Sequence, residues 1–215
     1  MQHPLSNEEK IKTMQWIASS ENNEELAERY DGIAATWDEN TSDYVTPERI
    51  ASKFIAYVQS NASILDAGCG TGILGELLSK QGYNTIEGFD LSAGMLKKAA
   101  DKGHYTALSQ QALGERLTFP DNQFDAVILS GVFLKGHAPS SSFDELIRVT
   151  KGNGYIAFTL RSELYHDNSD FKNKMSDLET GKHWKLIESD MFEVIPGVDK
   201  RPKVATFVYQ VLKNT

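Results

Sequence analysis

The spacing of apolar residues predicts helices in the first quarter of the chain. Between residues 7 and 59, apolar side chains recur every three or four positions, which places them on one face of a helix. The pattern predicts helices over 7–18, 23–37 and 47–59, and Pro47 suits the first turn of the third one. The third helix is expected to pack on a sheet through its apolar stripe, whereas the first two precede the first predicted strand.

After residue 63, short apolar runs alternate with helical patterns, which is typical of a parallel sheet with helices on its faces. The predicted strands cover 63–66, 85–89, 105–109, 124–130, 154–160, 184–194 and 204–212. The predicted helices cover 73–80, 92–101 and 143–149, followed by a polar helical stretch between 161 and 179. A turn at Pro196 and Gly197 is expected to join the last two strands as a hairpin.

The segment 64–72 is the most informative part of the chain. An apolar strand end runs through Asp66 into three glycines spaced by two, and helix-forming residues follow at once. Glycine accepts positive φ and lets a ligand approach the main chain, while the start of the helix leaves N–H groups free. A dinucleotide loop requires G-x-G-x-x-G, but position 73 is Ile and the pattern is G-x-G-x-G. A pyrophosphate cradle is therefore disfavoured.

A second signal lies eighteen residues beyond Gly72, where a short predicted strand ends in Asp90. In doubly wound sheets, an acid at the end of the second strand accepts hydrogen bonds from ribose hydroxyls. Taken alone, Asp90 is more often a solvated residue at a strand end. Its pairing with the glycine loop reverses that preference and predicts a nucleoside site.

The glycine loop and Asp90 together resemble the first two motifs of class I S-adenosylmethionine-dependent methyltransferases. The resemblance implies an α/β fold with a Rossmann-like seven-stranded methyltransferase sheet, mostly parallel with an antiparallel last strand and helices on both faces. A narrower resemblance, to methyltransferase-like proteins of the Williams–Beuren syndrome chromosomal region family, rests on residues 113–115, 124–127, 136–139 and 143–151. It spans most of 30–160, although 151–154 depart from the family's commoner turn, and it implies little about the substrate.

The class resemblance implies S-adenosylmethionine as cofactor and assigns residues to it. The backbone of Gly68, Cys69 and Gly70 is expected to face the methionine moiety, and Asp66 to orient the loop or to meet the ammonium group through water. Asp90 is expected to hold the ribose. The adenine is expected to pack on Leu91, and the ammonium to meet the backbone carbonyl of Ser130.

The adenine end departs from the usual pattern, in which an acid or amide follows the third strand. Here Leu113 stands in that region, so it is expected to stack on the ring while backbone groups near Gly114 satisfy the ring nitrogens. Gln111 is an alternative partner for the ring nitrogens.

Two aromatic residues precede the predicted sheet. Tyr30 and Trp37 resemble the aromatic helix that closes over the cofactor in many small-molecule methyltransferases, with Tyr30 reaching the carboxylate. Seven positions apart, they also fit a purely packing role on one helix face, and the two interpretations are equally favoured. Residues 1–46 are accordingly expected to form a helical cap over the cofactor site, and 47–215 the methyltransferase core of one structural domain.

His137, on the loop after the fourth strand, is the candidate catalytic base, because a neutral imidazole can take a proton from a hydroxyl or amine. An exposed surface histidine is the more common alternative. Arg161, Tyr165 and His166 are candidates for contacts with the acceptor substrate. The five histidines are scattered without metal-ligand spacing, so no metal is expected.

Charge and cysteine content limit the partners and the compartment. The net charge of −8 disfavours nucleic acids and anionic membranes, and neither a leader sequence nor a membrane-spanning run is expected. Cys69 is the single cysteine, so it cannot form an internal disulfide, which suits the reducing cytoplasm. The sequence predicts methyl transfer from S-adenosylmethionine to the O, N or S atom of a small molecule. The alternatives are an inactive S-adenosylmethionine-binding regulatory protein and, less favoured, an NAD-dependent oxidoreductase.

Overall fold

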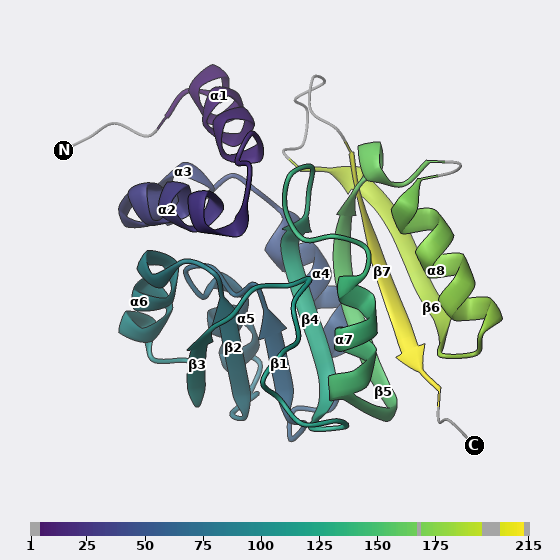
Figure 1. Cartoon of the computed structure of the whole chain (residues 1–215). Coiled ribbons are helices and arrows are strands. Elements are labelled where there is room, and N and C mark those ends of the chain that lie inside the picture. Colours follow the sequence, from purple (N-terminus) through teal and green to yellow (C-terminus); the bar gives the residue numbers. More distant parts are fainter. Residues whose placement is uncertain (1–4, 167–168, 195–202, 213–215) are drawn as a thin grey trace.

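The computed structural model describes residues 5–166, 169–194 and 203–212 (Figure 1). The chain begins with α1 (Asn7–Ala18) and α2 (Asn23–Ile33), followed by a 3₁₀ turn (Ala34–Thr36) and the short α3 (Trp37–Asn40). The prediction for α1 is confirmed to the residue, whereas the helix predicted over 23–37 is divided by the 3₁₀ turn. Ser6 and Glu9 form a capping box at the start of α1, which satisfies N–H groups that the first turn leaves free.

Seven strands form one sheet in the order β3-β2-β1-β4-β5-β7-β6. They are β1 (Ile64–Ala67), β2 (Ile86–Asp90), β3 (Ala107–Gln110), β4 (Phe124–Phe133), β5 (Thr150–Arg161), β6 (Trp184–Glu193) and β7 (Lys203–Val211). The first five strands are parallel, and β7 runs antiparallel between β5 and β6. The predicted sheet and the pairing of the last two strands are therefore confirmed, while the turn predicted at 196 and 197 lies outside the described residues.

Helices cover both faces of this sheet (Figure 1). They are α4 (Thr46–Ile55), α5 (Ile73–Lys80), α6 (Ala93–Lys102), α7 (Ser142–Val149) and α8 (Asp170–Thr180), with a 3₁₀ turn at Ser162–Leu164. On one face, α4 and α5 bury Ile50, Phe54 and Leu78. On the other, α7 and α8 bury Phe143 and Phe171. The domain thus has three layers, as a mostly parallel sheet requires.

The central strand β4 shows why the apolar runs had to be continuous. Ala126 and Ile128 belong to the core beneath α4 and α5, whereas Val127 and Leu129 belong to the core beneath α7 and α8. All four side chains are fully buried. Because successive residues of a strand point to opposite faces, a strand covered on both faces needs apolar residues at every position.

The topology places a ligand site at the carboxyl ends of the strands. Strand order reverses between β1 and β4, and an open α/β sheet binds its ligands in the crevice at this point. The N-terminal helices α1, α2 and α3 lie over that end of the sheet, on the side of β1, β2 and β3 (Figure 1). The carboxyl ends of β1, β2 and β3 are therefore covered by residues 7–40 (Figure 1).

Candidate active site

A pocket opens at the carboxyl ends of β1, β2, β4 and β5 and has a cavity volume of about 200 Å³. Its lining includes eleven of the twelve site residues predicted from sequence, namely Tyr30, Trp37, Asp66, Gly68, Cys69, Gly70, Asp90, Leu91, Leu113, Ser130 and His137. The twelfth, Gly114, lies outside the lining. Residues separated by more than one hundred positions thus meet at one place, and their individual roles stay predictions.

The glycine loop is tied to the end of β2 through its main chain. The N–H groups of Gly68 and Cys69 both donate to the carbonyl of Phe89, at 2.8 and 2.9 Å. Gly68 has φ +74°, and a Cβ there would lie 2.6 Å from the side chain of Val132. Gly70 has φ +54°, lines the pocket, and has no atom within 4 Å of the corresponding point. Packing therefore requires the first glycine, whereas the second leaves the main chain open to a ligand.

Asp66, at the end of β1, is fully buried and lines the pocket. Its Oδ2 accepts a hydrogen bond of 2.6 Å from the Tyr105 hydroxyl, while Oδ1 has no hydrogen-bond partner within the described structure. Burial raises the pKa of Asp66 to about 7, against the opposing effect of the Tyr105 hydrogen bond. A buried carboxylate oxygen without a partner is costly in an empty pocket and fits a cationic group of a ligand.

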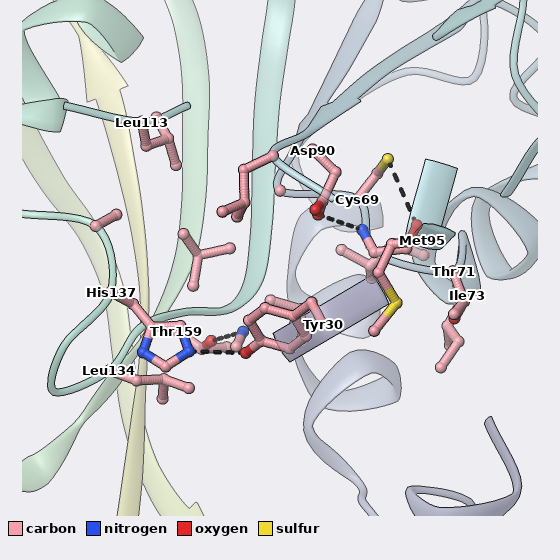
Figure 2. A pocket seen from close by; sticks show the side chains of 18 of the residues that line it. Tyr30, Cys69, Thr71, Ile73, Asp90, Met95, Leu113, Leu134, His137 and Thr159 are labelled. Carbon is pink, nitrogen blue, oxygen red and sulfur yellow. Dashed lines mark hydrogen bonds between the residues drawn. The ribbon is translucent and has the colours of Figure 1, made fainter. Parts of the chain in front are cut away.

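Asp90, at the end of β2, holds two parts of the site together. Its Oδ2 accepts from the N–H of Gly70 at 2.8 Å (Figure 2). Its Oδ1 accepts from the N–H of Ser92 at 2.9 Å. Burial raises the pKa of Asp90, and these backbone donors oppose that rise. Each carboxylate oxygen retains a second acceptor position, so the predicted bonds to ribose hydroxyls remain available. The structural role of Asp90 was missed by the sequence analysis.

Tyr30 and His137, 107 positions apart, form one hydrogen-bonded pair (Figure 2). The Tyr30 hydroxyl lies 2.7 Å from Nε2 of His137, and Nδ1 lies 3.0 Å from the carbonyl oxygen of Lys135. Because a carbonyl oxygen only accepts, Nδ1 carries the proton, and Nε2 accepts from the hydroxyl. Burial, assisted by the positive charge of Arg161, lowers the pKa of His137, which favours the neutral imidazole. The sequence analysis treated these two residues separately.

Two carboxylates bind the aromatic helical segment to the core. Asp31 Oδ1 accepts from the N–H of Gly94, at 2.7 Å, and from the hydroxyl of Ser92, at the start of α6. A carboxylate at the first turn of a helix is favoured by the helix dipole. Asp38 accepts from the Thr71 hydroxyl and forms an ion pair of 2.7 Å with Lys102. The sequence analysis missed both acids, although they are seven positions apart, like Tyr30 and Trp37.

The adenine end of the predicted site differs in part from expectation. Leu113 is buried and lines the pocket, as predicted. Gly114 instead has φ +95° and packs beside Pro139, where a Cβ would lie 2.9 Å from the ring. The Gln111 side chain lines the pocket, but its oxygen accepts from the N–H of Thr118 at 2.8 Å. Gly114 itself thus lies outside the pocket lining and the Gln111 oxygen already accepts from Thr118, so the partners of the adenine nitrogens stay a prediction.

The acceptor candidates after β5 are not all brought to the site. Arg161 lines the pocket, whereas Tyr165 and His166 lie outside its lining. Tyr165 packs edge-on against Phe207, with ring centroids 5.0 Å apart. Within the ranges described, no three His, Cys, Asp or Glu side chains converge as a metal site would require.

The strand order, the glycine loop after β1 and the acid after β2 define the class I S-adenosylmethionine-dependent methyltransferase fold. A family profile described as a methyltransferase domain matches residues 65–158, which include the loop, Asp90 and the strands that surround the switch point. The chain therefore carries a methyltransferase domain over these residues, and its sheet has the class I fold.

Curated relatives agree with this assignment. Methyltransferase-like protein 27 of Homo sapiens is 40% identical over 103 residues, which cover 47% of this chain and 42% of the human protein. The malonyl-acyl-carrier-protein O-methyltransferase of Buchnera aphidicola is 29% identical over 163 residues, covering 73% of this chain and 63% of that protein. The resemblance to methyltransferase-like proteins is confirmed, and the chain spans less than two thirds of either relative.

A solved structure shares the fold at low sequence identity. The structure of a complex between the Haloferax volcanii Trm112 methyltransferase activator and a methyltransferase aligns with this chain at a TM-score of 0.67. The two chains are 15% identical, and the alignment covers 86% of this chain and 98% of that one. At this identity the comparison shows the common fold alone.

Proposed function

We propose that this protein transfers the methyl group of S-adenosylmethionine to a small-molecule acceptor, with a hydroxyl oxygen as the favoured nucleophile. The observation that carries the proposal is the unpartnered, buried Oδ1 of Asp66 in a pocket that also contains the open main chain at Gly70. Such a site suits a ligand that combines a cationic end with a nucleoside. The relative from Buchnera aphidicola is named as an O-methyltransferase, which supports oxygen as the acceptor atom.

Cofactor binding is assigned to residues at the carboxyl ends of the strands. Asp66 would take the cationic end, the main chain at Gly70 would lie against the methionine moiety, and Asp90 would hold the ribose. The adenine would lie between Leu91 and Leu113, which both line the pocket. When bound, S-adenosylmethionine supplies an electrophilic methyl group on a positively charged sulfur.

Residues 1–46 would serve as a cap that excludes water. Tyr30 and Trp37 line the pocket from this segment, and Asp31 and Asp38 attach it to the core. Their rings pack edge-on, with centroids 5.7 Å apart. Exclusion of water and alignment of the acceptor are the effects on which methyl transfer chiefly depends, because charge disperses in its transition state. A pocket closed in this way favours a small acceptor over a macromolecule.

His137 would act as the general base for a hydroxyl acceptor. Its Nε2 lone pair is held by the Tyr30 hydroxyl, and its Nδ1 proton is held by the Lys135 carbonyl. An acceptor hydroxyl that takes the place of the Tyr30 hydroxyl would donate a hydrogen bond to Nε2, and the imidazole would accept its proton, which makes the acceptor oxygen a better nucleophile. The base role of His137 is a prediction. A location in the cytoplasm, inferred from the single cysteine, is also a prediction.

An assay with labelled methyl groups tests the proposal. Incubation of the protein with labelled S-adenosylmethionine and a panel of small phenols, carboxylic acids, amines and thiols should label at least one of them. A protein that binds S-adenosylhomocysteine but labels neither this panel nor the small-molecule fraction of a cell extract would be the inactive regulatory alternative. Binding of NADH in place of S-adenosylhomocysteine would identify the oxidoreductase, against which Ile73 argues.

The wall of the adenine subsite has its own test. Leu113 is 9% exposed, so Leu113→Asp would place a carboxylate against the ring. We expect cofactor binding to be lost, and tighter binding would contradict an apolar wall at this position.

A further inference from the structure

Tyr105 lies beneath the glycine loop and outside the lining of the pocket. Its hydroxyl donates to Asp66 Oδ2 at 2.6 Å and accepts from the N–H of Gly75, in α5, at 3.1 Å. The phenol therefore joins β1 to α5 from a position just before β3. From the sequence, this residue has only a place in the strand predicted over 105–109.

Three glycines, in the glycine loop, in α5 and in β2, make room for this ring. A Cβ on Gly75 would lie 2.4 Å from Tyr105 Cζ, one on Gly88 would lie 2.9 Å from Cε1, and one on Gly72 would lie 3.0 Å from Cε2. Glycine inside a helix or a strand weakens that element relative to alanine. Gly75 in α5 and Gly88 in β2 are such positions, and the space for the Tyr105 ring is a physical reason for both.

The hydrogen bond from Tyr105 makes the two carboxylate oxygens of Asp66 unequal. Oδ2 is fixed by the phenol, and Oδ1 keeps no partner in the described structure. A donor to a carboxylate stabilises its ionised form, which opposes burial and the nearby negative charge of Asp90, both of which raise the pKa of Asp66. Burial, together with the nearby negative charges of Asp66 and Asp90, raises the pKa of the Cys69 thiol, so that side chain stays neutral and adds no negative charge to the group.

We propose that Tyr105 is a positioning residue for the cofactor: its hydroxyl orients Asp66 and keeps it ionised, so that Oδ1 meets the cationic end of S-adenosylmethionine. The inference rests on the proposed function. Tyr105 acts through Asp66 without touching the cofactor, and its loss should therefore change how binding depends on pH.

Calorimetric titration of S-adenosylhomocysteine into wild type and Tyr105→Phe between pH 6 and pH 9 tests this inference. Loss of one hydrogen bond to a carboxylate should move the midpoint of the affinity curve upward by about one pH unit. The variant should then bind about tenfold more weakly at pH 6 and within about twofold of wild type at pH 9. 5′-Methylthioadenosine, which lacks the cationic end, should show the same pH profile with both proteins.

A second variant and a matched control separate this role from general packing. Gly75→Ala keeps the phenol but places a methyl group against its ring, and it should produce the same upward shift. Tyr83→Phe is the control, because Tyr83 is also buried and donates to the Val58 carbonyl, outside the pocket lining. It should leave the pH profile unchanged.

A double variant that combines Asp66→Asn with Tyr105→Phe tests whether Tyr105 acts through Asp66. If Tyr105 acts through Asp66, adding Tyr105→Phe to Asp66→Asn should change the affinity by less than about twofold. A pH profile of Tyr105→Phe that coincides with wild type, or an equal loss of affinity at every pH, would overturn the inference while the proposed function stands. Absence of S-adenosylhomocysteine binding by wild type at every pH would overturn both.

Discussion

The two walls of the pocket are built in different ways. The core wall consists of strand ends and the glycine loop, and main-chain hydrogen bonds hold it, such as those from Gly68 and Cys69 to the Phe89 carbonyl. The cap wall consists of α2 and α3, and the side chains of Tyr30, Asp31 and Asp38 hold it. Individual side-chain hydrogen bonds contribute little to stability, so we predict that the cap opens more readily than the core wall. We therefore propose that the core wall recognises the cofactor and that the cap closes over it.

The largest loss of cofactor affinity is expected from a substitution in the core wall. Asp90→Ala would remove the acceptor of the Gly70 and Ser92 N–H groups and, on our assignment, the ribose contact. Leaving the buried Ser92 N–H and the half-buried Gly70 N–H without this acceptor costs about 2 kcal/mol or more. We therefore expect S-adenosylhomocysteine affinity to fall more than about 100-fold and the melting temperature to drop. Calorimetry and thermal unfolding measure the two effects.

Asp101→Ala is the control for this prediction, because Asp101 is exposed and pairs with Lys97 on the surface of α6. Its affinity and stability should match wild type. If Asp90→Ala bound the ligand within threefold of wild type, the core wall would not be the recognising wall.

The pair that joins the two walls should affect turnover more than binding. His137→Ala removes the proposed base, and we expect kcat with a hydroxyl acceptor to fall about 100-fold, a typical contribution of general base catalysis. The affinity for S-adenosylhomocysteine should change less than about threefold. Tyr30→Phe, which keeps the ring but removes the hydrogen bond to Nε2, should lie between wild type and His137→Ala. Unchanged turnover of His137→Ala would end the assignment of a base.

The buried carboxylate of the core wall predicts a pH dependence of stability. Burial raises the pKa of Asp66 from its ordinary value of 3.8 to about 7, so the folded protein binds more protons than the unfolded chain between these values. Protonation of Asp66 in the folded state therefore stabilises the protein at low pH, and this stabilisation is lost as the pH rises through about 7.

Between pH 7 and pH 5, this linkage should raise the free energy of unfolding of the ligand-free protein by about 2 kcal/mol. Asp66→Asn, which cannot titrate, should lack this slope and should be more stable than wild type at pH 7. Denaturant unfolding at a series of pH values measures both. Parallel curves for the two proteins would show that Asp66 is already ionised in the ligand-free pocket.

The smallest expected effect is on the attachment of the cap. Asp31→Ala removes two hydrogen bonds at the start of α6, and we expect S-adenosylhomocysteine affinity to fall about fivefold while the core keeps its melting temperature. Limited proteolysis should cut the variant faster than wild type between residues 19 and 45. Glu28→Ala, an exposed change on the same helix, should behave as wild type. Equal cleavage of all three proteins would mean that Asp31 does not hold the cap.

The difference between the core wall and the cap wall also explains which features the sequence could predict. The elements of the sheet follow from local apolar patterns, and Asp66, the glycine loop and Asp90 form a motif within 25 residues of one chain segment. The bond between Tyr30 and His137 spans 107 positions, that between Asp31 and Gly94 spans 63, and that between Tyr105 and Asp66 spans 39. Such contacts depend on the packing of separate elements, and spacing in the sequence cannot specify them.

The strands that differ from prediction have local causes. β4 continues through Gly131 to Phe133, although a glycine with positive φ reads as the end of a strand. There its N–H donates to the Thr159 hydroxyl at 2.8 Å, within a region where the pairing of β4 with β5 shifts register. Likewise, β5 begins at Thr150 because it pairs with Phe124, before the apolar run that marked it.

The central claim is that the core wall recognises a nucleoside with a cationic end. Calorimetric titration of S-adenosylhomocysteine into the wild-type protein, with NADH titrated under the same conditions, tests it most directly. The account predicts binding of S-adenosylhomocysteine with micromolar affinity and no binding of NADH. Binding of NADH together with no detectable binding of S-adenosylhomocysteine would contradict it.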